Sequence, residues 1–98
     1  IPVTPGIAER LASMIVTLAD DTGREIARSQ GAALMGNPLS VVVWLAEDMA
    51  ASGQRLRKGD LLSLGSFSPL SPPAAGRTVT ATYLGLADQP VSVRVSFR

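Results

Sequence analysis

The side chains able to do chemistry in this chain are few in kind. The 98 residues include no cysteine and no histidine. Thiolate nucleophiles, imidazole bases, disulfides and the usual soft-metal ligands are therefore excluded together. Acid/base or metal chemistry would fall to carboxylates, the single lysine, the single tyrosine or hydroxyl groups.

Adjacent carboxylates occur twice, as Asp20-Asp21 and as Glu47-Asp48. The first pair lies in a turn-like Asp-Asp-Thr-Gly segment, where carboxylates usually accept hydrogen bonds from the backbone. The second pair falls on the polar side of an expected helix, which favours solvation. Lys58 lies in an Arg-Lys-Gly-Asp segment that is typical of an exposed turn. We therefore expect no metal site and no catalytic lysine within this chain.

Asn37 is a candidate for binding a substrate carboxylate, because it directly precedes the expected helix. The free N–H groups and the positive dipole end of a helix N-terminus attract anions. An asparagine here also caps the helix by accepting a backbone hydrogen bond. We expect the cap, with any anion contact made by the helix end as a whole.

Gly65, Ser66 and Phe67 form the second candidate binding segment. A glycine lets a ligand approach the backbone, and the hydroxyl beside it can donate to a carboxylate or keto oxygen. An ordinary serine at a strand end explains Ser66 equally well. Phe67 suits an apolar pocket wall or the core, and we favour the core. Trp44 and Tyr83 are expected in the core or in a subunit interface.

The first residues are expected to form a connecting stretch, and a β-hairpin is expected to follow it. Two prolines and a glycine among the first six residues indicate a connecting stretch, which we assign to residues 1–10. Alternating apolar residues predict a strand from Ser13 to Ala19, and Gly23 suits the tight turn that follows. Arg24 to Ser29 is expected to return as a partly exposed strand.

A helix is expected from Pro38 to Ser52. Proline suits the first helical position, and Gly53 suits the left-handed residue that ends a helix. One stripe of this helix is apolar and predicts that it is largely buried. The stripe consists of Val42, Leu45, Ala46 and Met49.

Three strands are expected after the helix, at Leu61 to Phe67, Thr78 to Leu84 and Val91 to Phe97. The last two alternate apolar and polar residues, so we expect them to pair as an antiparallel hairpin. Two strands, a helix and three strands make an α+β layout. A chain of 98 residues has room for one core, and residues 1–98 are assigned to one domain.

The composition excludes several classes of partner. The net charge is +1, and the basic group at Arg55, Arg57 and Lys58 is too small to attract nucleic acid or an anionic membrane. The apolar run from Val41 to Ala46 is far shorter than the roughly 20 residues that span a bilayer. We expect a soluble, cytoplasmic protein.

Several motifs follow one another in a recognisable order. Gly31 to Leu39 leads into a Val-Trp-Leu-Ala sequence, and a Leu-x-x-Gly-Asp turn ends at Asp60. Gly65-Ser66, a proline-rich loop and a closing alternating segment complete the set, which covers residues 11–98. This order resembles the C-terminal part of the fumarylacetoacetate hydrolase superfamily, closest to its 2-keto-4-pentenoate hydratase and 4-oxalocrotonate decarboxylase branch.

The resemblance implies a mixed, rolled β structure around a pocket for a short 2-keto or 2-hydroxydienoate acid. It also implies a homo-oligomeric lyase, a hydratase or decarboxylase, that binds Mg²⁺ or Mn²⁺ through three carboxylates, two of them in a Glu-x-Glu pair. This chain has no Glu-x-Glu. We therefore expect the metal ligands upstream of the matched region, and we expect the 98 residues alone to be inactive.

Two alternatives stay open on the sequence alone. One is a carbon-carbon hydrolase of the acylpyruvate type from the same superfamily, and the other is a binding or assembly module without catalysis. Relatives commonly carry an aspartate after the glycine of the proline-rich loop, where this chain has Arg77. That difference lies in a loop and concerns the exact substrate more than the fold.

Overall fold

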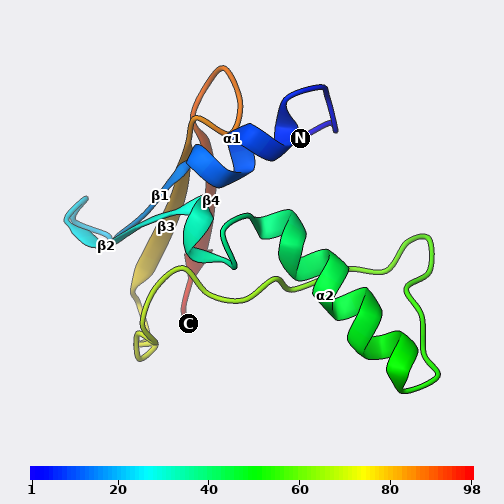
Figure 1. Ribbon diagram of the computed structural model, residues 1–98. Helices are drawn as coiled ribbons and strands as arrows, with labels where there is room; N and C mark the ends of the chain where they lie inside the picture. The colour runs from blue at the N-terminus through cyan, green and yellow to red at the C-terminus, as the bar shows by residue number, and fades with distance from the viewer.

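A four-stranded antiparallel sheet and two α-helices make up the computed structural model, which describes residues 1–98 (Figure 1). The strands are β1 (Ile15–Ala19), β2 (Glu25–Gln30), β3 (Thr78–Leu84) and β4 (Val91–Ser96), in the spatial order β2-β1-β3-β4. The expected α+β class is confirmed. All pairings within the chain are antiparallel, so the mixed, rolled sheet remains an expectation about the whole fold.

The first hairpin forms as expected, because its turn residues satisfy the backbone locally. The Asp20 side chain accepts the Thr22 backbone N–H at 2.9 Å, and Gly23 has a φ of 83°. Both features are those of a tight turn built from a short acid and a glycine. The second hairpin joins β3 to β4, which also confirms the expected pairing.

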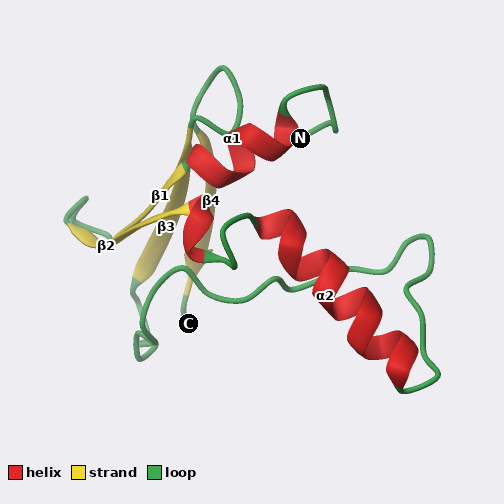
Figure 2. Ribbon diagram, viewed as in Figure 1, coloured by secondary structure: helices red, strands yellow, loops and turns green.

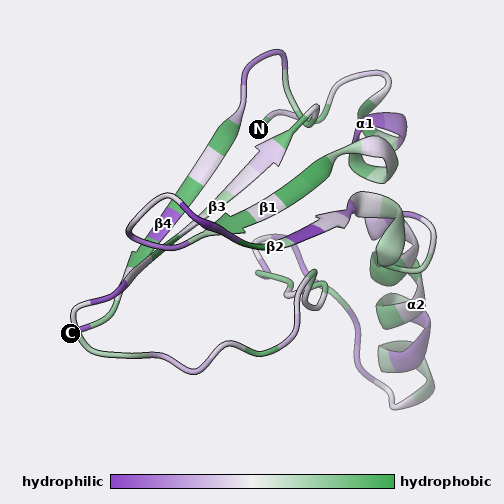
Figure 3. Ribbon diagram, turned by 90° about the vertical axis from the view of Figure 1, so that its left-hand side faces the viewer, coloured by the Kyte–Doolittle hydropathy of each residue, from purple (hydrophilic) through white to green (hydrophobic).

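The two faces of the sheet differ in chemistry, as their alternating sequences require. One face, called the apolar face below, consists of Val16, Leu18, Val79, Ala81, Tyr83, Val91, Val93 and Val95. The opposite face carries hydroxyls, two pairs of which hydrogen-bond across β3 and β4: Thr78 with Ser96 at 2.9 Å, and Thr82 with Ser92 at 3.0 Å. Figure 3 shows the alternation along β4.

A helix was not expected where α1 (Ile7–Ser13) forms, since residues 7–10 were assigned to a connecting stretch. Its N-cap is Gly6, with a φ of 83° and no side-chain cap, so the usual signal of a helix start is missing. Arg10 donates a hydrogen bond to Asp88 at 2.8 Å, which links α1 to the β3–β4 loop. The helix depends on contacts made elsewhere in the chain.

Close backbone packing holds the end of α1 against the short 3₁₀-helix η1 (Gly31–Ala33). Gly31 is buried, and a Cβ at this position would overlap the Leu11 carbonyl oxygen and lie 3.1 Å from Met14 Cγ. Only glycine lets the two segments approach this closely. The Gly31 backbone N–H also donates to the Met14 carbonyl at 2.9 Å.

The expected long helix is α2 (Pro38–Ala51), but it is not largely buried. Pro38 is its only buried residue, and the predicted stripe is half-exposed. The helix extends away from the sheet (Figure 1), and its Val43 and Trp44 side chains are 59% and 51% exposed. Apolar residues therefore occupy both sides of α2, a pattern typical of a helix that is covered on both sides.

The prediction of a strand from Leu61 to Phe67 is wrong. These residues form no strand, and Figure 2 shows the whole segment between α2 and β3 as a loop. A strand needs a neighbour to complete its hydrogen bonds, and none lies beside this segment. Gly65, with a φ of 109°, bends the backbone near its end.

The chain is more open than a self-contained domain of its size. Its accessible surface is 7178 Å², whereas a folded monomer of 10.2 kDa has about 5,300 Å². Its radius of gyration is 15.3 Å, against about 12.6 Å for a compact domain of this length. Only four of 98 residues are buried, so most of the apolar surface lacks a cover. Neither α-helix has the length and apolar character needed to cross a bilayer.

Candidate functional site

One cavity of about 200 Å³ lies where the loop that contains Gly65, Ser66 and Phe67 crosses the sheet. Its floor is the β2 side of the apolar face. The cavity is smaller than typical ligand pockets, which hold about 300–1,000 Å³, and therefore suits a small molecule. The lining residues are Val16, Leu18, Ala27, Arg28, Gly65, Ser66, Phe67, Ser68, Ala81 and Tyr83.

Three of the four residues predicted to bind substrate line this cavity. Gly65, Ser66 and Phe67 reach the cavity because the chain bends over the sheet at Gly65. The Ser66 hydroxyl donates to the Ser68 carbonyl at 2.7 Å. Its proton is thus used within the loop, and the hydroxyl must rotate before it can donate to a ligand.

Tyr83 lines the cavity, although the sequence pattern placed this residue in a core or an interface. It lies opposite Val16 in the β1–β3 pairing, on the apolar face, and it lines the cavity. Its hydroxyl has no hydrogen-bond partner within the chain and is open to solvent. A lone tyrosine that alternates with threonines in a strand was the only available signal.

Arg28 also borders the cavity, but its cation is directed elsewhere. In the β1–β2 pairing it lies opposite Thr17, whose position places it on the other face of the sheet. Its guanidinium holds Glu25 through two hydrogen bonds of 2.9 Å. These bonds lower the pKa of Glu25 and raise the pKa of Arg28. The cavity therefore contains no free cation of its own.

Asn37 does not line the cavity. The expected cap is confirmed, because its Oδ1 accepts the Leu39 backbone N–H at 2.9 Å. Its Nδ2 donates to the Ala8 carbonyl, also at 2.9 Å. Both ends of the amide are used within the fold, and Asn37 connects α2 to α1.

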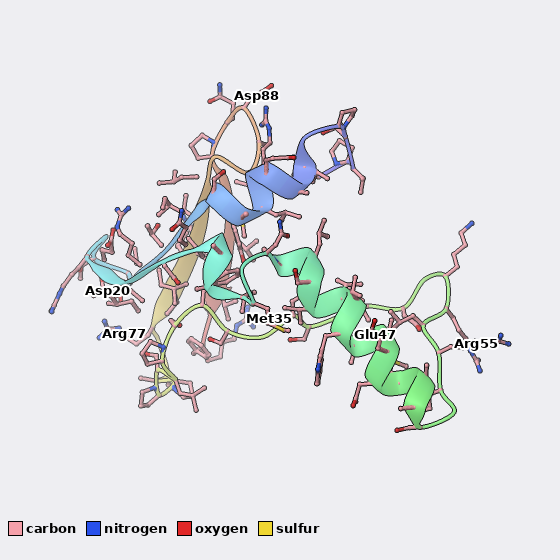
Figure 4. All side chains as sticks on the ribbon, viewed as in Figure 1. Asp20, Met35, Glu47, Arg55, Arg77 and Asp88 are labelled. Carbon is pink, nitrogen blue, oxygen red and sulfur yellow. The ribbon has the colours of Figure 1, made fainter.

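Both members of the first acidic pair form ion pairs with Arg77; Figure 4 labels Asp20 and Arg77. The guanidinium Nε donates to Asp21 Oδ1 at 2.7 Å, and another nitrogen lies 3.8 Å from Asp20 Oδ2. The Thr22 hydroxyl donates to Asp20 at 2.6 Å and lowers the pKa of this carboxyl, with smaller contributions from two backbone N–H groups and Arg77. Arg77 thus links the first hairpin to the start of β3.

The remaining acids are dispersed. Glu47 and Asp48 are exposed on α2, where Figure 4 shows Glu47 directed away from the sheet. No three carboxylates of the chain lie close enough together to hold a metal ion. The residues present therefore do not fit the three-carboxylate site that the resemblance implied. Lys58 is exposed in its turn.

Comparison with known proteins finds hydratases. The chain is 39% identical over 87 residues to a 2-keto-4-pentenoate hydratase of Paraburkholderia phymatum, which covers 89% of this chain and 31% of the relative. It is 36% identical over 97 residues to one of Paraburkholderia xenovorans, covering 98% and 34%. The TodF product hydratase of Pseudomonas putida is 36% identical over 77 residues, covering 79% and 28%.

No family model matches the chain. The pairwise similarity nevertheless extends over nearly all of it, and the same enzyme name recurs among the relatives. The chain spans about a third of the length of the curated relatives it matches. It is therefore a homologue of the 2-keto-4-pentenoate hydratases, and it corresponds to one portion of such an enzyme.

Proposed function

We propose that this chain is the C-terminal portion of a lyase that adds water to a short 2-hydroxydienoate, the enol form of 2-keto-4-pentenoate. The observation that carries the proposal is the similarity, over 89% of the chain, to an enzyme named for this reaction. Several other relatives have names of the same kind, which favours hydration over carbon-carbon hydrolysis.

The cavity supports this substrate class. Val16, Leu18 and Phe67 provide apolar walls for the carbon chain of a dienoate, and the small Ala81 leaves room beside them. The free Tyr83 hydroxyl is the donor that we assign to a substrate oxygen. A tyrosine hydroxyl donates one hydrogen bond, which suits a keto or carboxylate oxygen of a small acid that lies against the apolar walls.

The groups that bind the substrate carboxylate and transfer protons are proposed to come from the remaining portion of the enzyme. Within this chain, the nearest cation is paired with Glu25, and the acids do not gather around one point. The divalent ion, Mg²⁺ or Mn²⁺, would likewise be held by carboxylates outside these 98 residues. This chain supplies the apolar wall and the free Tyr83 hydroxyl.

A chimera tests the proposal. The region of the Paraburkholderia phymatum hydratase that aligns with this chain is replaced by residues 1–98, and the purified protein is supplied with Mg²⁺ and 2-hydroxypenta-2,4-dienoate. We expect the dienoate absorbance to decay with formation of the hydrated product. The unmodified hydratase is the positive control, and an acylpyruvate is offered in a parallel reaction.

The outcomes separate the alternatives. Consumption of the acylpyruvate alone would assign the chain to the hydrolases. A chimera that has the same oligomeric mass and thermal stability as the control, yet consumes neither compound, would contradict the proposal and favour a non-catalytic module.

A further inference from the structure

The β4 edge of the apolar face, at Val93 and Val95, is uncovered. Val93 is 55% exposed and Val95 is 51% exposed, although both point to the same side of the sheet as the buried Val16. In Figure 3 both helices lie toward the β2 side of the sheet, away from β4. The loop between α2 and β3 lines cavities with Val16, Leu18, Ala81 and Tyr83, and with Val79, whereas Val93 and Val95 stay exposed.

This exposure follows from register rather than from fraying at a strand end. Val93 pairs with Ala81, and Val95 pairs with Val79, inside a continuous β3–β4 ladder. The neighbouring positions Ser92 and Arg94 face the hydroxyl-rich side. A strand whose apolar and polar residues alternate strictly normally packs its apolar side chains against a core. In β4 these side chains are exposed to solvent.

The excess surface of the whole chain sets an upper limit on the contact that is missing at the β4 edge. The chain exposes about 1,900 Å² more than a compact monomer of its mass. One partner in an obligate interface buries about 1,000–2,500 Å². This excess belongs to the whole chain, with the protruding α2 and the exposed loops included, and its size matches surface that is covered in an obligate assembly rather than in a transient contact.

We propose that the β4 edge of the apolar face is the docking surface for the preceding portion of a hydratase chain, an inference that rests on the proposed function. In the relatives, every copy of this region comes with about twice its length of additional polypeptide. Strand β4 is also an edge strand, so the docking segment can reach both its exposed side chains and its free backbone groups. A second copy of this chain is the competing occupant.

A two-piece experiment tests the docking. Residues 1–98 are co-expressed with the part of the Paraburkholderia phymatum hydratase that precedes the aligned region, and the complex is isolated through a tag on that part. We expect a stable complex whose mass contains both pieces. Val93→Asp and Val95→Asp each place a charge in the contact and are expected to weaken association by about 100-fold.

Ser92→Asp is the matched control, because it puts the same side chain one position away on the opposite face. It is expected to associate within about threefold of the wild-type chain. Equal weakening by all three variants, or no complex at all, would overturn the docking surface. Self-association of residues 1–98 that Val93→Asp abolishes would assign the surface to a second copy and overturn the proposed occupant.

The docking surface and the hydratase function can be contradicted independently of each other. The relative's own C-terminal piece, supplied in the same way, shows whether a two-piece enzyme can turn over substrate. If that control is active, and residues 1–98 bind equally well without activity, the docking surface stands and the hydratase function falls.

Discussion

The side-chain amide of Asn37 joins the two helices, because its Nδ2 donates to the carbonyl oxygen of Ala8 at 2.9 Å. The same side chain caps α2 through Leu39. A residue considered for anion binding is thus occupied at both ends by backbone groups. The helix N-terminus that it caps is held beside α1, outside the cavity.

Substitutions at Asn37 are expected to separate its two roles. Asn37→Asp keeps the capping oxygen but places an acceptor against the Ala8 carbonyl, so it should cost about 1 kcal/mol of folding free energy. Asn37→Ala loses both contacts and should cost about 2–3 kcal/mol. Urea unfolding followed by circular dichroism measures both values. Equal stabilities of the aspartate variant and the wild type would show that the Ala8 contact contributes nothing.

Gly31 should tolerate no side chain. Gly31→Ala drives a Cβ into the Leu11 carbonyl and separates α1 from η1, with an expected loss of about 3 kcal/mol. Gly23→Ala is the control, since its position is open and only its positive φ is disfavoured, at about 1 kcal/mol. Thermal unfolding compares the two. A Gly31 variant no less stable than the Gly23 variant would contradict the packing described for α1.

The Asp20 carboxylate is expected to stabilise the first hairpin in a pH-dependent way. Its pKa is lowered in the folded chain, so its contribution is fully present above the unfolded pKa of about 3.9 and is lost as the pH falls through the lower folded value. Asp20→Asn keeps an acceptor for Thr22 but removes the charge. Urea midpoints measured from neutral pH downward should therefore differ between the two proteins near neutral pH and converge as the pH falls through the lowered pKa of folded Asp20. A difference that stays constant with pH would exclude a role for the charge.

Tyr83 is expected to contribute to turnover in the chimera. Tyr83→Phe removes the free hydroxyl while keeping the ring, and kcat/KM for the dienoate should fall about 10- to 100-fold. Thr82→Val, one residue away on the other face, should leave kcat/KM unchanged while losing the bond to Ser92. Steady-state kinetics on both variants decides the point. Similar losses in the two would indicate a general weakening of β3 instead of a contact with substrate.

Local chemistry explains which parts of this fold could be predicted. The first hairpin, the Asn37 cap and the β3–β4 pairing each depend on neighbouring residues, and all three are confirmed. Gly65 and Ser66 were candidates for a pocket wall, whereas Phe67 was expected in the core, and all three line the cavity. That they bind a substrate stays a prediction.

The wrong predictions have a common cause. The structure of each of these segments depends on distant parts of the chain or on polypeptide beyond it. Helix α1 lacks a side-chain cap and is held by Arg10, Gly31 and Asn37, whose positions no local pattern reveals. The segment from Leu61 to Phe67 has strand-like residues but no neighbouring strand. The apolar pattern of α2 fits a buried helix, yet these 98 residues supply too little chain to cover it.

The central claim is that the residues around the cavity under the Gly65–Phe67 loop form one wall of the substrate pocket. It is tested most directly by titrating the two-piece complex with 2-oxopentanoate, an unreactive saturated analogue, when only residues 1–98 carry ¹⁵N. We predict that the amide signals of Gly65, Ser66 and Tyr83 shift with one common saturation curve, while those around Asn37 stay in place. Shifts confined to the start of α2, with the cavity signals unmoved, would contradict the claim.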